Sequence, residues 1–181
     1  MIYLQSISET DANNTYVSWL NDKAVNQYLE LRFNSQTLAS VVDTIRSTIA
    51  SPCEHLFTIR LQETGKHIGN IKVGGINAQH NIAHISLFIG DKLSWGKGIA
   101  TQAIELISQY SFKHLQLRKL CAAAYDNNIA STKAFLKIGY IDDCIFTNHY
   151  ILEGKPCNLV QVCMFEHQAG HLAEINVLPI P

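Results

Sequence analysis

Apolar residues recur with two different periods along the chain, and the change of period separates predicted helices from predicted strands. Residues 2–7 alternate as a short strand does, whereas 12–20 repeat at helical spacing behind Ser8 or Thr10, either of which is placed to cap the helix. Residues 23–31 fit a second short helix. The N-terminal part of the chain therefore predicts one strand followed by helices.

The clearest helix covers residues 35–50, where the apolar positions form one stripe along a single helix face. The stripe consists of Leu38, Val41, Val42, Ile45 and Ile49. Asn34 or Ser35 is placed to cap this helix, and Pro52 lies beyond its end.

The pattern then changes to strands. Residues 56–61 and 67–74 flank a turn at 63–66 and predict a hairpin. After a loop around 77–81, residues 83–89 predict a central strand that Gly90 ends.

Helix and strand alternate in the rest of the chain. Helical spacing returns over 99–115, and 119–125 predict a buried strand with small side chains. Asn128 is placed to cap a helix that Gly139 ends, because glycine readily adopts the backbone angles found beyond a helix. The last two predicted strands are 143–151 and 158–166, on either side of the turn 153–155.

This order predicts a single α+β domain over residues 1–167, followed by a tail of unknown role at 168–181. About four helices flank a twisted mixed sheet of about seven strands. The sheet is expected to be antiparallel except where the helix 99–115 crosses between two neighbouring strands, because such a crossover joins parallel strands.

Composition narrows the class of protein. The chain has 181 residues, 47% of them apolar and 16% charged, which suits one packed domain and excludes a charge-rich disordered chain. The formal net charge is −1. No basic stripe is visible, so nucleic acid is not an expected partner.

The apolar runs, the first residues and the cysteines of the sequence indicate the cellular compartment. No apolar run is long enough to span a bilayer, and the first twenty residues lack a basic start followed by an apolar stretch. The five cysteines contain no C-x-x-C pair and predict reduced, mostly buried thiols. We expect a cytoplasmic protein with no membrane partner, as a monomer or a homodimer.

Candidate chemistry begins at the turn from Trp95 to Thr101. Gly96 and Gly98 permit backbone angles that let successive N–H groups converge, and the following helix start adds unpaired donors beside Lys97. The turn is suited to a pyrophosphate. It is not a P-loop, and Thr101 stands where a Rossmann fingerprint has its third small residue. A simple tight turn between strand and helix is the other interpretation.

Three segments in order resemble one family, the GNAT superfamily of N-acetyltransferases, and within it the RimJ/RimL-like branch. They are the turn 95–101, the segment Asn127–Ser131 with Gly139–Tyr140, and the hairpin 65–71. The turn is similar to that family's acetyl-CoA pyrophosphate loop, although Leu93 replaces its first Gln or Arg. The resemblance extends over residues 2–166 and implies the GNAT fold and acetyl transfer from acetyl-CoA to an amine.

The resemblance also implies where acetyl-CoA, the expected acetyl donor, is held. Backbone groups of the turn and helix start are expected to grip it, namely Ser94, Trp95, Gly96, Lys97, Gly98, Ile99 and Ala100. The strand residues Leu87, Phe88 and Ile89 should reach the thioester, with an N–H near Phe88 or Ile89 as oxyanion donor. Asn128 and Ser131 match the segment that contacts coenzyme A. Asn128 is equally suited to cap its helix.

Several side chains compete for the role of general base. His84, at the start of its strand, comes first because imidazole accepts a proton near neutral pH, although an ordinary half-buried strand histidine is the other interpretation. Glu30 is second and is otherwise a solvated helix end. His149 and Tyr150, on a late strand, are third. A water molecule is a further possibility.

The general acid is also open. At the position where many relatives carry a tyrosine that protonates the leaving thiolate, this chain has Phe135. Either Tyr140 or Tyr150 takes that role, or the thiolate leaves unassisted.

The acceptor is predicted from residues 18–33, because the sequence of this segment resembles that of enzymes that acetylate amino sugars on nucleotide carriers. Arg32 is expected to pair with phosphates, Phe33 or Tyr28 to stack on the base, and His149 to line the pocket. A protein N-terminal acetyltransferase and a non-catalytic acetyl-CoA-binding module remain alternatives. The pair His167 and His171 has no third ligand nearby, so no metal is expected.

Overall fold

The computed structural model describes residues 1–172, which form a seven-stranded sheet in the order β1-β2-β3-β4-β5-β7-β6. The strands are β1 (Ile2–Ser6), β2 (His55–Leu61), β3 (His67–Asn77), β4 (Ile82–Ile89), β5 (Lys119–Tyr125), β6 (Ile141–Leu152) and β7 (Lys155–Phe165). The α-helices are α1 (Asn14–Asn21), α2 (Lys23–Asn26), α3 (Leu38–Ala50), α4 (Ile99–Lys113) and α5 (Ile129–Leu136). Short 3₁₀ turns are η1 (Glu9–Asp11), η2 (Glu30–Phe33), η3 (Lys92–Ser94) and η4 (Glu166–His171).

The pairing of the strands confirms the predicted mixed sheet. Every pair is antiparallel except β4 with β5, the two strands that α4 connects. The single parallel pair thus lies at the crossover that the sequence predicts. None of the helices within residues 1–172 is both long and apolar enough to cross a membrane.

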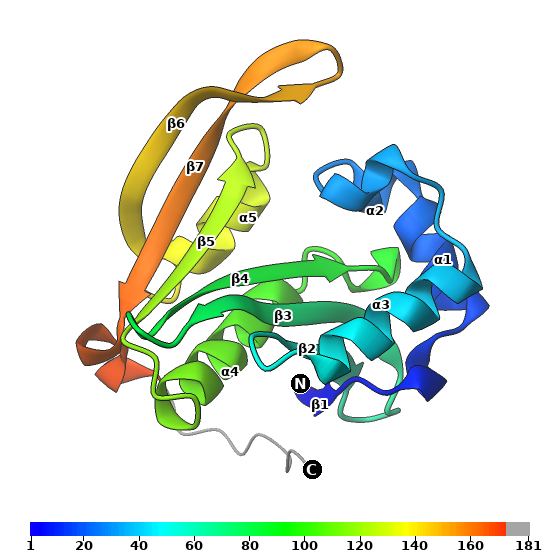
Figure 1. Cartoon of the computed structure of the whole chain (residues 1–181), viewed down its shortest axis with the longest axis horizontal. Helices are drawn as coiled ribbons and strands as arrows, with labels where there is room; N and C mark the ends of the chain where they lie inside the picture. The colour runs from blue at the N-terminus through cyan, green and yellow to red at the C-terminus, as the bar shows by residue number, and fades with distance from the viewer. Residues whose placement is uncertain (173–181) are drawn as a thin grey trace.

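Helices cover the two faces of the sheet unequally (Figure 1). The larger apolar cluster joins α4 to one face through fully buried residues such as Ile104 and Ile107. The smaller cluster joins α1 and α3 to the other face through Trp19 and Ile45. In Figure 1 the hairpin of β6 and β7 rises past the rest of the sheet, across from α2.

The boundaries of the N-terminal helices differ from the prediction. Asn13 caps α1 by accepting a hydrogen bond from the N–H of Tyr16, whereas Ser8 belongs to η1. Thr37, and not Asn34 or Ser35, caps α3 in a reciprocal pair with Ser40. In each case the side chain that reaches a free N–H of the first turn fixes the start, and several polar residues in a row offer equivalent candidates.

The predicted helix 23–31 is wrong in its second half. Residues 23–26 form α2, and the chain then turns before η2 at Glu30–Phe33. The buried amide of Asn26 donates to the carbonyl of Leu20, which holds α2 against the end of α1. This break places residues 28–33 beside β5 instead of continuing one helix.

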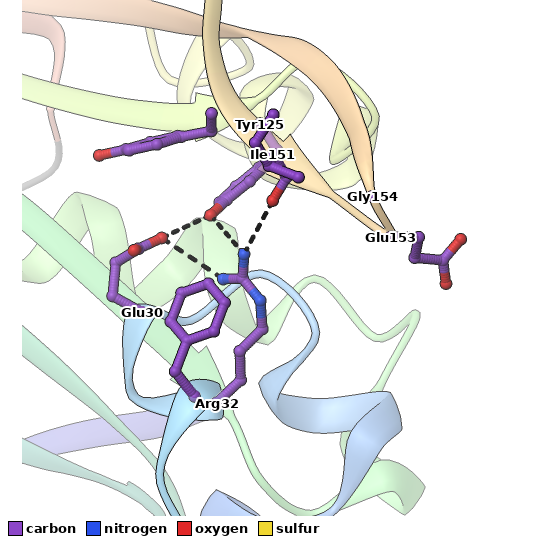
Figure 2. Close-up of a pocket in the computed structure, with 8 residues that line it drawn as sticks. Glu30, Arg32, Tyr125, Ile151, Glu153 and Gly154 are labelled. Atoms are coloured by element: carbon purple, nitrogen blue, oxygen red, sulfur yellow. Dashed lines mark hydrogen bonds and ion pairs between the residues drawn. The ribbon is translucent and has the colours of Figure 1, made fainter.

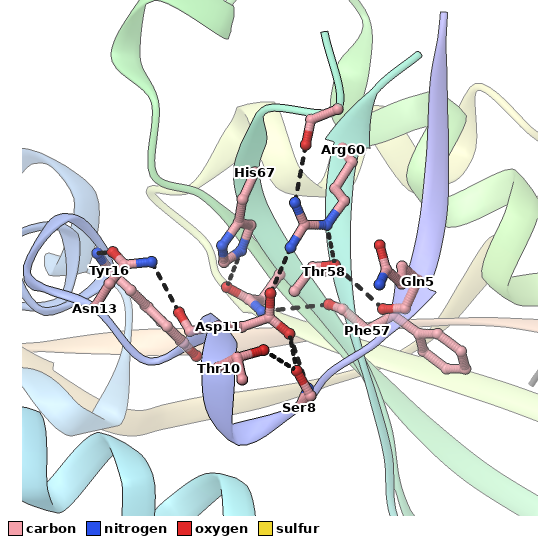
Figure 3. A network of polar contacts seen from close by, with 12 residues as sticks. Gln5, Ser8, Thr10, Asp11, Asn13, Tyr16, Phe57, Thr58, Arg60 and His67 are labelled. Carbon is pink, nitrogen blue, oxygen red and sulfur yellow. Dashed lines mark hydrogen bonds and ion pairs between the residues drawn. The ribbon is translucent and has the colours of Figure 1, made fainter. Parts of the chain in front are cut away.

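A polar network beneath α1 connects the N-terminal segment to the sheet (Figure 3). Arg60 forms an ion pair with the buried carboxylate of Asp11 and donates to the carbonyl of Gly65. His67 Nε2 lies 3.1 Å from the Asn70 side-chain oxygen. The His67 ring also packs edge-on against Trp19, so the network supports the helix that carries Trp19.

The packed domain continues beyond residue 167. His171 Nε2 lies 2.9 Å from the carbonyl oxygen of Ile138, and Ala169 and Leu172 pack against the larger apolar cluster. The first part of the predicted tail is therefore attached to the fold, and residues 173–181 of that tail lie outside the described residues.

Candidate active site

The site is built on the place where β4 and β5 separate. The two strands pair only over Ile82–His84 and Lys119–Cys121. Further along, Leu87 and Ile89 pair with β3, and β5 pairs with β7. The edges of β4 and β5 beyond this point therefore face an opening. Leu87, Phe88 and Ile89, which the resemblance to the GNAT family assigns to the thioester, lie on this part of β4.

The glycine turn lies at the end of β4 and leads into α4. Gly96 and Gly98 have φ values of 73° and 72°, a region that favours glycine, and an added Cβ at either would meet nothing within 4 Å. Gly98 is the N-cap of α4, where no side chain caps the helix and no acidic residue lies in the first turn. The N–H groups at the helix start are thus open to an anion, as the pyrophosphate interpretation requires.

Other side chains of the turn hold its shape. Trp95 Nε1 donates to the carbonyl of Ile89 at 2.8 Å, and Ser94 Oγ donates to Asp91 at 2.9 Å. Asp91 also pairs with Lys66. Trp95 and Ser94 therefore brace the turn with their side chains. Their backbone N–H groups, which were expected to grip acetyl-CoA, instead donate to the carbonyls of Lys92 and Asp91. The backbone of Lys97, Ile99 and Ala100 is left for a ligand.

A cavity of about 350 Å³ opens where the N-terminal segment approaches β5 and the β6–β7 hairpin (Figure 2). Its lining combines aromatic rings with charged groups. The residues are Glu30, Arg32, Phe33, Tyr125, Tyr150, Ile151, Glu153 and Gly154. Glu30, Arg32, Phe33 and Tyr150 were expected at the site from the sequence, and the structure brings these four together.

Tyr125 connects the walls of this cavity. Its hydroxyl donates to Glu30 Oε1 at 2.5 Å and accepts from Arg32 Nη2 at 2.8 Å. Its ring stacks on Tyr150, with centroids 5.0 Å apart. Burial and the Glu30 hydrogen bond raise the pKa of Tyr125 to about 12, so the phenol remains protonated and donates.

The predicted base His84 lies away from that cavity. It pairs with Cys121 at the closed end of the opening, its side chain is exposed, and its ring lies near Gly75. The structure therefore separates His84 from Glu30 and Tyr150.

The predicted substrate residues occupy different positions around the mouth. Phe33 is 66% exposed at the cavity wall, and the Tyr28 hydroxyl donates to the carbonyl of Asn127 at 3.3 Å. His149 is exposed and lies beside Phe146 and Tyr150 rather than in the cavity lining. Arg32 uses its guanidinium within the protein, as described below.

The residues near α5 show which side chains are available to a ligand. Asn128 accepts a hydrogen bond from the N–H of Ser131, so it does cap the helix, and both residues remain partly accessible. Phe135 and Tyr140 are buried against each other, and Tyr140 forms a hydrogen bond with Ser108. Burial raises the pKa of Tyr140. This enclosed hydroxyl cannot reach a thiolate, which leaves Tyr150 as the accessible tyrosine of the two.

The sequence did not point to Tyr125, Ile151 or Glu153 as site residues. Tyr125 ends a strand of small residues that was predicted to be buried, although Ala123 is exposed and Ala124 half-buried. The partners of Tyr125 lie 95 and 93 positions away in the chain. Ile151 contributes a backbone carbonyl, which carries no residue-type signal. The one usable signal was the change from small residues to tyrosine at the end of β5.

The possible metal ligands and the cysteines within residues 1–172 do not form a reactive site. No group of three or more His, Cys, Asp or Glu side chains is placed to hold a metal ion there. Three cysteines are buried and none of the five forms a disulfide. Burial raises the pKa of Cys121 to about 11, which keeps that thiol protonated.

Comparison with protein families matches most of the chain. A family model described as acetyltransferase (GNAT) domain matches residues 2–141. Spermidine N(1)-acetyltransferase of Escherichia coli K12 is 29% identical over 110 residues, which is 61% of this chain and 58% of that enzyme's length. The chain therefore aligns with little more than half of that relative. Uncharacterized N-acetyltransferase YoaA of Bacillus subtilis is 24% identical over 156 residues, 86% of this chain and 88% of YoaA.

Solved structures show the same fold. Spermidine N-acetyltransferase from Vibrio cholerae in complex with CoA and spermine superposes with a TM-score of 0.83 at 17% identity, covering 93% of this chain and 97% of that one. A structure described as a probable acetyltransferase has a TM-score of 0.79 at 19% identity, covering 92% of this chain and 93% of that one.

Proposed function

The chain belongs to the GNAT acetyltransferase family, and from that premise we propose that it transfers an acetyl group from acetyl-CoA to a primary amine of a small molecule. One observation carries the proposal. The turn at Gly96 and Gly98, where an added Cβ would meet nothing within 4 Å, lies at the start of α4, directly beside the separation of β4 from β5. The N–H groups at the start of α4, which suit an anion, and the accessible edge of β4 therefore face the same opening.

The residues divide the work in this proposal. The backbone of residues 96–100 holds the pyrophosphate, and the β4 edge at Phe88 and Ile89 supplies an N–H to the carbonyl oxygen. The C–S bond of the acetyl-CoA thioester breaks as the new amide bond forms, and coenzyme A leaves as a thiolate that takes a proton from Tyr150 or from solvent. The proton of the amine passes to His84, to Glu30 or to solvent.

We propose a nucleotide-linked amino sugar as the acceptor, within the RimJ/RimL-like branch. Exposed Phe33, half-buried Tyr150 and the planar groups of Glu30 and Arg32 suit a polar ring compound, because flat rings pack on aromatic faces while polar groups fix hydroxyls. The cation of Arg32 also favours an acceptor with phosphates over one with several ammonium groups.

A polyamine is the second candidate. Relatives named as spermidine acetyltransferases favour it, as do the two carboxylates, Glu30 and Glu153, in the cavity lining. A protein N-terminus is a third acceptor class, which the same chemistry could serve.

The experiment is a thiol-release assay with acetyl-CoA and three acceptor classes: amino-sugar nucleotides, spermidine and N-terminal peptides. We expect the sugar nucleotides to release thiol most efficiently. We also expect Arg32→Gln to raise the KM for the sugar nucleotide far more than the KM for acetyl-CoA. Efficient turnover of peptides or spermidine, with no release from the sugar nucleotides, would reject this acceptor. Binding of acetyl-CoA without release from any amine would indicate the non-catalytic module.

A further inference from the structure

The guanidinium of Arg32 is enclosed by groups that ordinarily bind an organic cation. Its carbon lies 4.2 Å from the centroid of the Phe33 ring and 5.1 Å from that of Tyr125. Glu30 Oε1 is 3.4 Å from Nη1. We call this arrangement the cation cage, made of Glu30, Phe33, Tyr125 and the carbonyl oxygens of Leu29 and Ile151.

Hydrogen bonds from three parts of the chain fix the guanidinium in the cage (Figure 2). Nη1 donates to the carbonyl of Leu29 at 3.0 Å, and Nη2 donates to the Tyr125 hydroxyl at 2.8 Å and the Ile151 carbonyl at 3.4 Å. The Arg32 side chain is only 13% exposed. It is therefore a permanent part of the cavity wall rather than a free surface charge.

Aromatic faces beside a carboxylate are a recognised environment for ammonium and guanidinium groups. In this protein the environment is already filled by the chain's own cation. An acceptor that carries a second ammonium group would have to displace Arg32 or remain close to it. Displacement is unfavourable because it breaks the hydrogen bonds of the guanidinium. Proximity is unfavourable because it brings two positive charges together where Glu30, the carboxylate of the cage, is already engaged by Arg32 and Tyr125.

We propose that Arg32 is a specificity-determining residue that excludes acceptors carrying a second positive charge. The inference rests on the proposed acetyl transfer and adds a selection rule to it. Acceptors whose remainder is neutral or anionic are used, and diamines and polyamines are poor substrates. The selection opposes the second candidate acceptor class, although relatives carry the names of polyamine enzymes.

The test uses three acceptors of equal chain length that differ only at the end remote from the reacting amine. Aminopentanol ends in a hydroxyl, aminovalerate in a carboxylate and cadaverine in a second ammonium group. For the wild type we expect the kcat/KM of cadaverine to be at least about tenfold below that of aminopentanol, from like-charge repulsion in a partly buried cavity. Equal use of cadaverine and aminopentanol by the wild type would overturn the proposal without any variant.

The variants identify the residue responsible. Arg32→Gln should bring the two kcat/KM values to within about threefold of each other, since it removes the charge that repels the second ammonium group. Arg32→Lys keeps the charge and should keep the discrimination. Arg46→Gln is the matched control, because Arg46 lies on α3 in an exposed pair with Glu9 and changes the net charge equally. A ratio that shifts as much in Arg46→Gln as in Arg32→Gln would contradict the assignment.

A binding measurement separates this inference from the proposed function. Calorimetric titration with spermidine needs no turnover, and we expect Arg32→Gln to bind it about tenfold more tightly than the wild type does. If no amine releases thiol from any of the proteins, the proposed activity is wrong, and the spermidine titration still decides the role of Arg32. Equal spermidine affinities in the wild type and a folded Arg32→Gln variant would overturn the inference even if acetyl transfer is confirmed.

Discussion

At the scale of single residues, His84 and Glu30 lie at opposite ends of the opening between β4 and β5. His84 pairs with Cys121, and Glu30 bonds to Tyr125, which lies four positions further along β5. Strand residues advance by about 3.3 Å each, so these positions are about 13 Å apart along the strand. One amine cannot contact both side chains, so each choice of base implies a different binding position for the acceptor.

His84→Ala tests whether the acceptor amine binds beside His84. If His84 accepts the amine proton, the variant should lower kcat by about 10²-fold, the usual contribution of a general base. Thiol release at saturating acetyl-CoA measures it, with His80→Ala as the control, because His80 is an exposed histidine in the loop before β4. A nearly normal kcat would transfer the assignment to Glu30, to His149 or to water, and Glu30→Gln would then be the decisive variant.

Sequence reasoning found the residues of the site that act through a local motif and missed those that act through the fold. The glycine turn is visible in the sequence because it is formed by residues next to each other in the chain. The cation cage is not, because Glu30 and Arg32 meet Tyr125 only once the strand β5 is placed beside η2. Arg32 was expected to pair with phosphates directly, whereas its Nη1 and Nη2 groups donate within the protein, so its effect on an acceptor is that of its charge.

At the scale of elements, the turn between β4 and α4 depends on glycine for both shape and space. Gly98 has a positive φ, which asparagine and aspartate tolerate better than other residues with side chains. Nothing lies within 4 Å of an added Cβ at this position. Substitution there therefore tests the electrostatics of the anion site with limited steric disturbance.

Gly98→Asp and Gly98→Asn form a matched pair for that test. The two side chains have nearly the same size, but only aspartate places a negative charge at the helix start, where an anion is expected. We expect Gly98→Asp to bind acetyl-CoA at least about tenfold more weakly than Gly98→Asn, with both variants folded by circular dichroism. Equal calorimetric affinities for acetyl-CoA in the two variants would exclude an anion site at this turn.

The contact between α1 and the end of β4 also depends on a glycine, Gly90. An added Cβ at Gly90 would lie 2.1 Å to 2.4 Å from ring atoms of Trp19. Trp19 itself packs against both Tyr16 and His67 and is 9% exposed, so it has little room to move.

Gly90→Ala should therefore destabilise the protein by about 1–3 kcal/mol, as overpacking of a core does. The free energy of unfolding from a denaturant titration measures the effect. Gly74→Ala is the matched control, since this glycine also lies at the sheet but its added Cβ would meet mainly the flexible ends of Lys72 and Glu54. Similar losses in the two variants would show that adding a Cβ in or next to a strand, and not the Trp19 contact, sets the cost.

At the scale of the whole molecule, the order of the helices and strands was predictable from the sequence. How the N-terminal helices are held against the sheet was not. Alternating and helical periods depend only on which side of a strand or helix faces the core, so the mixed sheet with its single crossover followed from the pattern. The attachment of residues 1–50 to the sheet depends on polar contacts without a period. Asp11 meets Arg60, 49 positions away, and this pair with His67 supports α1.

Stability of the whole molecule should fall in mild acid because His67 is part of that support. Burial lowers the pKa of His67 in the folded protein, Arg60 lowers it further, and the hydrogen bond to Asn70 and the charge of Asp11 only partly oppose this. The unfolded chain takes up the proton at about pH 6.5. A depressed histidine pKa means that the unfolded state binds more protons, so the contribution is complete above that pH and is lost as the pH falls toward the folded pKa.

The expected result is a lower melting temperature at about pH 5.5 than at about pH 7.5, the interval that spans the ordinary histidine pKa. His55, whose pKa burial also lowers, adds to the fall, whereas the lowered pKa values of Asp22, Asp91 and Asp143 act only in stronger acid. His67→Gln should therefore reduce the difference without abolishing it. His80→Gln should leave it unchanged, because that side chain is exposed. If His67→Gln shows the full wild-type difference between the two pH values, the acid sensitivity arises elsewhere than in the network beneath α1.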